Sequence, residues 1–174
     1  MTGVKYGKSQ WTPSVKIMKS FGKVAALPAD APLCVMVGLK RGKIPALLDT
    51  GAQSSCIRSD IAEFLRLAAE TRVFKPCSIN YVLANGTQYK VEKILKLVVK
   101  ILGFSWDHHF HVLEGGSFPA ILGLDFMGRT GMTVNVSAKQ FKFEFAPHLT
   151  GKCGTDEVGS DGGNYLQSTQ SRSQ

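Results

Sequence analysis

The sequence contains no apolar run long enough to cross a membrane and no segment with the pattern of a secretory signal peptide. No internal repeat is present. The four cysteines form no C-x-x-C pair, so the usual spacing of a zinc site is missing. We therefore expect free thiols in a reducing, cytoplasmic compartment, no membrane partner and no metal site. The cysteines are Cys34, Cys56, Cys77 and Cys153.

Length and composition allow one folded domain with tails. The chain has 174 residues, of which 44% are hydrophobic, enough for a core in a domain of this size. Frequent glycines between short apolar runs favour many short strands over long helices. We expect the folded domain at residues 31–147, after a flexible N-terminal arm at 1–30 and before a disordered C-terminal tail at 148–174.

The formal net charge of +8 is the main compositional bias. A basic balance can indicate nucleic acid, an anionic membrane or acidic substrates as partners. Here the lysines are scattered and many alternate with apolar residues, which is typical of solvated strand faces. No RNA-recognition motif or zinc knuckle is present, so we expect no nucleic-acid partner. The alternative, a nucleic-acid-associated protein, predicts salt-dependent binding to RNA or DNA.

Alternating apolar and polar residues predict an all-β domain with one or two short helices. The turn chemistry of Asn85 and Gly86 predicts a hairpin. Helical spacing predicts a helix that begins at Ser59, and one helical turn at 124–128. The predicted strands cover residues 33–39, 44–48, 77–83, 89–101, 110–113, 132–136 and 140–145.

Two short motifs carry the functional signal. Asp49-Thr50-Gly51 follows the apolar residues 46–48 directly, and a carboxylate is almost never fully buried without a partner. Taken alone, D-T-G is also a common turn composition, and Asp49 could merely cap a helix. The second motif, Ile121-Leu122-Gly123, favours the functional interpretation of D-T-G over the turn interpretation, because glycine is needed where a strand passes close under a loop.

The order of these motifs resembles the retropepsin family of aspartic proteases. The match is in Ala-Leu-Leu-Asp-Thr-Gly-Ala around Asp49, Leu-Ala-Asn-Gly-Thr around Gly86, and Ile-Leu-Gly-Leu-Asp-Phe around Gly123, within residues 32–146. In detail it is most similar to the proteases of gypsy-type LTR retrotransposons. The resemblance implies an all-β, closed, mostly antiparallel domain that forms a homodimer about a two-fold axis.

The resemblance also implies roles for single residues. Asp49 matches the catalytic aspartate, Thr50 the residue whose hydroxyl bonds across the dimer axis, and Gly51 the glycine whose carbonyl accepts a hydrogen bond from the peptide. The hairpin around Gly86 is implied to form a mobile flap over the substrate. The residues implied to bind substrate are Ala52, Gln53, Leu83, Ala84, Asn85, Gly86, Thr87 and Ile121. The residues implied to support the site are Ser55, Leu122, Gly123 and Asp125.

The sequence contains a single D-T-G and no D-S-G. Two carboxylates that share a proton can activate water and protonate the leaving group, so the second must come from Asp49 of another copy. We expect an aspartic endopeptidase that cuts a retroelement polyprotein, in the cytoplasm or in retroelement particles, without a cofactor. The alternative is a retropepsin-like dimerisation or binding module that no longer cuts.

The histidines of Asp-His-His-Phe-His suggest a different chemistry. If this segment is a strand, His109 and His111 share a face and could hold a metal. No carboxylate or cysteine at ligand spacing supports that reading. We therefore expect a polar strand edge at His108, His109 and His111.

Overall fold

The computed structural model describes residues 33–40, 42–67, 74–82, 86–116, 118–154 and 158–160. The arm expected at 1–30 lies outside the described residues, as do 161–174. Three residues expected at the tip of the flap, Leu83, Ala84 and Asn85, also lie outside them.

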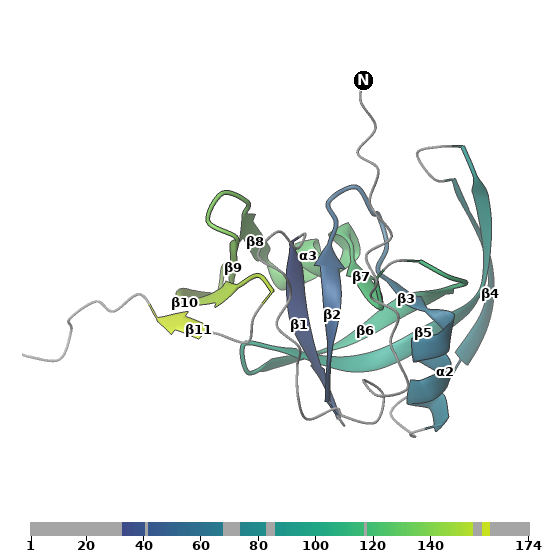
Figure 1. Ribbon diagram of the computed structural model, residues 1–174, viewed down its shortest axis with the longest axis horizontal. Coiled ribbons are helices and arrows are strands. Elements are labelled where there is room, and N and C mark those ends of the chain that lie inside the picture. Colours follow the sequence, from purple (N-terminus) through teal and green to yellow (C-terminus); the bar gives the residue numbers. More distant parts are fainter. Residues whose placement is uncertain are drawn as a thin grey trace, which may run out of the picture.

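Strands make up most of the described chain, and the prediction of an all-β domain with one or two short helices is confirmed, since two short helices lie in the described residues (Figure 1). The elements are β1 (Cys34–Leu39), β2 (Gly42–Leu48), β3 (Cys56–Arg58), α2 (Ser59–Leu67), β4 (Phe74–Val82), β5 (Gln88–Ile101), β6 (Phe104–Leu113), β7 (Ala120–Leu122), α3 (Leu124–Thr130), β8 (Met132–Asn135), β9 (Gln140–Phe143), β10 (Ala146–Lys152) and β11 (Val158–Ser160).

The larger sheet closes into a barrel. Its seven strands follow the order β1-β2-β7-β3-β6-β5-β4, and β1 also pairs with β5, so that six strands form a closed ring with β4 outside it. The closing contact joins Gly38 to Lys100. A side chain at Gly38 would place its Cβ 3.2 Å from the Cβ of Lys100, so glycine permits the two strands to meet. The β4–β5 hairpin extends beyond the ring (Figure 1).

The core lies inside this ring, and buried and exposed residues alternate along the second half of β5. On β5, Leu95, Leu97, Val99 and Ile101 point inward and are buried, while the residues between them are exposed. This is the period of two that the apolar pattern predicts. Among the described residues, no helix has both the length and the apolar character needed to cross a membrane.

The C-terminal strands form a second sheet, in the order β11-β10-β9-β8. Phe141 and Phe143 of β9 are buried against the core, but Phe145 lies in the turn after β9 and is 56% exposed. The strand predicted at 140–145 therefore ends early. Gly151 of β10 pairs with Phe141 and packs so closely on its ring that a Cβ would lie 2.3 Å from Cζ.

The predicted domain boundary at residue 147 is wrong. β10 crosses it, and residues 148–154 and 158–160 belong to the fold rather than to a disordered tail. The physical reason is that β10 completes the backbone pairing of β9, and β11 pairs with β10 in turn. The small and polar residues here permit close strand packing as well as disorder, so composition alone gives the wrong result.

Candidate active site

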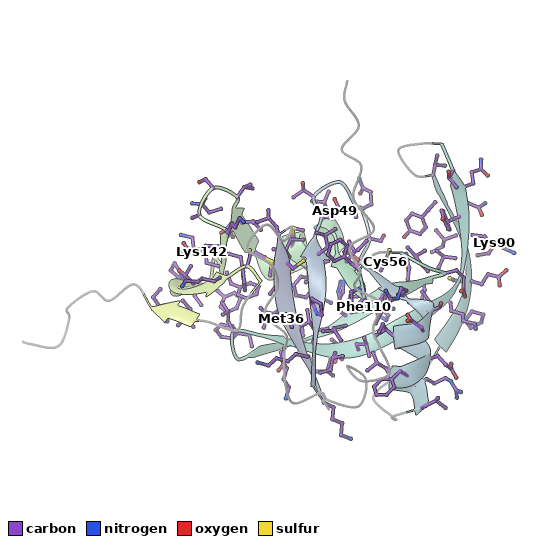
Figure 2. All side chains as sticks on the ribbon, viewed as in Figure 1. Met36, Asp49, Cys56, Lys90, Phe110 and Lys142 are labelled. Carbon is purple, nitrogen blue, oxygen red and sulfur yellow. The ribbon has the colours of Figure 1, made fainter. Side chains whose placement is uncertain are left out.

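Asp49 stands at the end of a buried parallel strand pair. β2 and β7 run side by side, with Leu48 in register with Leu122, and the Asp49 N–H continues the pairing by donating to the Leu122 carbonyl at 3.1 Å. The chain then turns, and the Gly51 N–H donates to the Asp49 carboxylate at 2.8 Å. Asp49 is half-buried and Thr50 and Gly51 are exposed, so the carboxylate is held in place but remains accessible (Figure 2).

The chain after β7 passes directly beneath this turn. Leu124 N–H donates to the Ala52 carbonyl at 2.8 Å, and Asp125 N–H donates to the Gln53 carbonyl at 3.2 Å. A Cβ on Gly123 would lie only 2.6 Å from the Ala52 carbonyl oxygen, a distance that no side chain tolerates. The glycine of the I-L-G motif is thus required by the close approach of two backbones.

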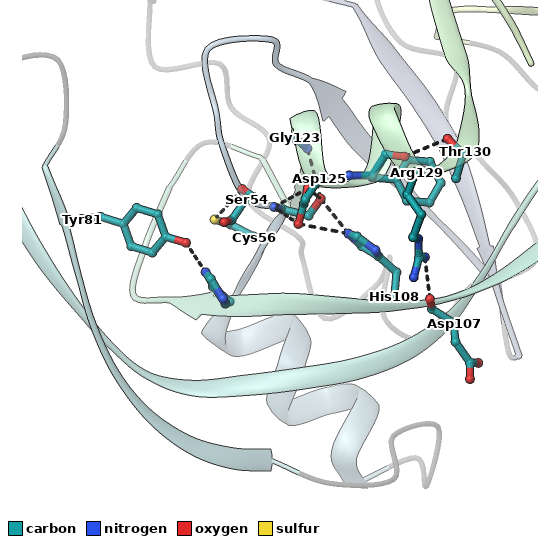
Figure 3. Close-up of polar contacts among 12 residues, drawn as sticks. Ser54, Cys56, Tyr81, Asp107, His108, Gly123, Asp125, Arg129 and Thr130 are labelled. Atoms are coloured by element: carbon teal, nitrogen blue, oxygen red, sulfur yellow. Dashed lines mark hydrogen bonds and ion pairs between the residues drawn. The ribbon is translucent and has the colours of Figure 1, made fainter.

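A polar cluster holds the loop after the turn from below (Figure 3). The Ser55 N–H donates to both oxygens of Asp125 at 3.0 Å, and the Ser55 hydroxyl donates to the same carboxylate at 2.7 Å. The Ser55 oxygen also accepts the Gly123 N–H at 3.1 Å. Ser55 is fully buried, so its polar atoms are satisfied within the protein, as burial requires.

His108 is the fourth member of this cluster. Its Nε2 lies 2.9 Å from the Ser55 hydroxyl oxygen and 3.4 Å from the Asp125 carboxylate. Because the one hydroxyl hydrogen of Ser55 goes to Asp125, Nε2 must carry the hydrogen that His108 donates. Burial lowers the pKa of His108 to about 4, although Asp125 opposes this shift. The ring is therefore neutral at pH 7.

The expected polar strand edge is wrong for His108, which is buried, whereas His109 is exposed. β3 pairs with β6 only at His111, Val112 and Leu113. His108 follows Phe104 and Trp106 in the inward phase of β6 and packs on Phe110 and Phe126. That apolar phase is the sequence signal that could have identified His108 as a buried residue. Among the described residues, no three His, Cys, Asp or Glu side chains gather to hold a metal ion.

The family described as gag-polyprotein putative aspartyl protease matches residues 35–129. This range contains the turn at Asp49, the polar cluster and the strand beneath them. The chain belongs to this aspartyl protease family. No curated protein sequence matches it.

One solved structure supports this assignment at the level of the fold. The retroviral protease-like domain of Ddi1 from Leishmania major is 19% identical with a TM-score of 0.54, and the match covers 77% of this chain and 98% of that one. The protease of EIAV, solved with the inhibitor HBY-793, is 17% identical with a TM-score of 0.48, over 64% of this chain and 99% of that one. The retropepsin-like fold predicted from the motif order is confirmed.

The strand register brings two of the predicted residues, Asp49 and Ile121, to one face of the barrel. His111, Cys56, Ile121 and Leu47 follow one another across β6, β3, β7 and β2. Residues in register project to the same side, and so does Asp49, two positions after Leu47. We call these five residues the Asp49 face. Their sequence neighbours Ile57, Ala120, Leu122 and Phe110 point the opposite way, into the core.

The remaining predicted residues lie around this face. Ala52 is half-buried and Gln53 is exposed in the loop after Asp49. Gly86 and Thr87 precede β5, in the connection of the β4–β5 hairpin, where Gly86 has a φ of 82° that suits glycine. The five-residue Asp49 face was not predictable as a unit, because the register between distant strands is not written in any local pattern.

Cys56 sits on the Asp49 face without acting as a nucleophile. Its thiol donates to the Ser54 carbonyl at 3.5 Å. Burial, with the carboxylates of Asp125 and Asp49 nearby, raises the pKa of the Cys56 thiol to about 12. Because the thiolate is the reactive form, this face offers carboxylate chemistry rather than thiol chemistry.

Replacing Gly123 should damage the site through the backbone. We expect Gly123→Ala to lower the free energy of unfolding by about 1–3 kcal/mol, because the added carbon forces Ala52 away. Gly128→Ala is the matched control, since it lies in α3 with no atom within 4 Å of its Cβ; it should stabilise the protein by roughly 0.5–1 kcal/mol. Urea denaturation measures both, and equal effects would contradict this account.

His108 should make the free energy of unfolding depend on pH. Because burial places its folded pKa at about 4 and the unfolded pKa is about 6.5, the unfolded chain binds a proton first as the pH falls. Stability is then complete above about pH 6.5 and declines by roughly 2–3 kcal/mol towards pH 4. Denaturation curves of His108→Gln, measured at several pH values, should no longer show this decline in stability. The exposed neighbour His109 provides the control, because His109→Gln should keep it.

Proposed function

We propose that this chain is an aspartic endopeptidase whose active site forms when two copies meet. The observation that carries the proposal is the half-buried Asp49 carboxylate, fixed by the Gly51 N–H at the end of β2 and accessible from outside. Membership of an aspartyl protease family supports it. The proposed substrate is a retroelement polyprotein, cut in the cytoplasm or in retroelement particles.

The need for a second copy follows from the partners of the other aspartates that the structure describes. Asp125 holds Ser55, Asp60 pairs with Arg58 at 2.6 Å, and Asp107 pairs with Lys96 at 2.6 Å. The sequence has no second D-T-G. A two-fold axis close to Thr50 would bring the Asp49 carboxylates of two copies together, which is how an isologous dimer builds a symmetric site.

An apolar groove beside Thr50 suits this contact. It has a volume of about 430 Å³. Among its lining residues, Leu124 and Val136 are large apolar side chains that the single chain leaves exposed, Val136 by 68%. Exposed apolar surface next to a functional loop marks an interaction site. A second copy would bury this surface and place the two Thr50 hydroxyls against each other.

The chemistry of the proposed pair needs one shared proton. Carboxylates about 3 Å apart cannot both ionise, so the two titrate as a unit. The ionised Asp49 would take a proton from a water molecule, and the protonated one would donate to the carbonyl oxygen of the peptide bond. The water oxygen then bonds to the carbonyl carbon. Collapse of this intermediate breaks the C–N bond as the nitrogen receives a proton.

The first test removes the carboxylate charge. Asp49→Asn should reduce peptide cleavage at least a thousandfold, because neither copy can then accept the proton of water. Asp107→Asn, at an exposed acid, should retain activity within about twofold, since the contact of Asp107 with Lys96 is a weak surface ion pair. Mass spectrometry of a digested polyprotein precursor measures both variants. Cleavage by Asp49→Asn at the wild-type rate would refute the proposal.

The second test charges the apolar groove. Val136→Glu should weaken self-association at least tenfold and make activity strongly dependent on protein concentration, because two buried carboxylates would face each other. Val98→Glu is the control, since Val98 is also exposed, by 50%, but lies on β5 outside the groove. Sedimentation velocity across a concentration series distinguishes them. A dimer unaffected by Val136→Glu would place the interface elsewhere.

A further inference from the structure

The β4–β5 hairpin folds back over the Asp49 face. In the ladder, Tyr81 is paired with Tyr89, whereas His111 is paired with Ile94, much further along β5. The Tyr81 hydroxyl nevertheless forms a hydrogen bond with Nδ1 of His111, and the two rings lie 5.4 Å apart between centroids. The hairpin must therefore curl inward, and Tyr81 reaches across to β6 (Figure 3).

This contact lies within reach of a peptide bound at Asp49. Three strand spacings separate His111 on β6 from Asp49 at the end of β2. Neighbouring strands are about 4.8 Å apart, so the separation is roughly 14 Å, or about four residues of an extended chain. A peptide lying across the Asp49 face would thus pass Tyr81 and His111 with a side chain about four residues from the cleaved bond.

Both groups of the contact are neutral and polar. Burial lowers the pKa of His111 and raises the pKa of Tyr81, so neither carries charge at pH 7. The Asp125 carboxylate is near both. An acidic side chain inserted here would face that negative charge. An apolar one would leave the imidazole without the hydrogen bond that Tyr81 now makes to it, which is costly in a partly buried site, while Tyr81 keeps its side-chain contact with Ser54.

A carboxamide satisfies both groups at once. Its carbonyl oxygen can accept from one partner while its N–H donates to the other. Because the group has both functions, it fits whichever nitrogen of His111 carries the hydrogen. In the free protein the phenol is bonded to the imidazole and also contacts Ser54, so the inserted amide replaces the single Tyr81–His111 hydrogen bond with two.

We propose that Tyr81 and His111 are a specificity-determining pair that selects Asn or Gln in the peptide, about four residues from the cleaved bond. The proposal rests on the proposed function, since it assumes that a peptide crosses the Asp49 face. It assigns to the hairpin a role in recognition as well as in covering the substrate.

The test uses octapeptide libraries in which one position at a time is fixed as Gln, Glu or Leu and the others are random. Wild-type protein should cleave the Gln library about tenfold better than the Leu or Glu library at one position, the difference expected for one well-formed hydrogen bond. Tyr81→Phe should remove that preference by raising KM, with kcat changed less than twofold. Tyr89→Phe, directly opposite on β5, should keep it.

The histidine has its own matched pair of variants. His111→Leu should lose the Gln preference, and His109→Leu, on the exposed part of the same strand, should retain it. A preference that survives in both Tyr81→Phe and His111→Leu, or a wild-type preference for Leu or Glu at this distance, would overturn the proposal.

A binding experiment separates this proposal from the proposed function. Immobilised Asp49→Asn protein is exposed to the same libraries, and the retained peptides are sequenced. Enrichment of Gln that depends on Tyr81 supports the recognition pair even if the wild-type protein cleaves nothing, an outcome that would refute only the protease. Absence of enrichment in this experiment contradicts the pair, whatever the wild-type activity.

Discussion

The candidate site depends on one close approach, the passage of the chain after β7 beneath the turn at Asp49. Two backbone hydrogen bonds from Leu124 and Asp125 to the turn hold it there. They can form only because Gly123 has no side chain at the point of contact. The turn therefore has little freedom of its own: β2 fixes its beginning and the Gly123 segment fixes its middle. A carboxylate carried by such a turn is placed by the barrel rather than by a flexible loop.

This arrangement also decides what each acid can do. Asp125 lies close to Asp49 in the fold, yet it accepts three hydrogen bonds from Ser55 and one from the Phe126 N–H. A carboxylate used in this way supports the loop and is not free to share a proton with Asp49. In the proposed enzyme the barrel would supply half of a two-carboxylate site, and the exposed apolar groove beside Thr50 would be the surface on which the second half joins. In the proposed dimer, self-association and catalysis would depend on the same few residues.

The parts of the structure that the sequence predicts are those encoded locally. Asp49 and Gly123 are each recognisable because turn and close-contact geometry restrict the residue type. The β4–β5 hairpin follows from its turn residues. What the sequence does not reveal is how distant segments meet. His108 is polar, and although the apolar phase of β6 indicates its burial, its contacts with Ser55 and Asp125 become clear only in the folded barrel. Likewise, β10 contains small and polar residues, and it becomes a strand only through pairing with β9.

Acid has opposite effects on the buried histidine and on the chemistry proposed above. A pair of carboxylates works only while it retains one proton, which acid favours, whereas acid also tends to protonate His108 and to destabilise the fold. Burial resolves much of this conflict, because it lowers the pKa of His108 to about 4. The imidazole then stays neutral and keeps its contacts with Ser55 and Asp125 through mildly acidic conditions. A histidine surrounded by Phe110 and Phe126 is thus a support that tolerates the pH range in which a shared proton is retained.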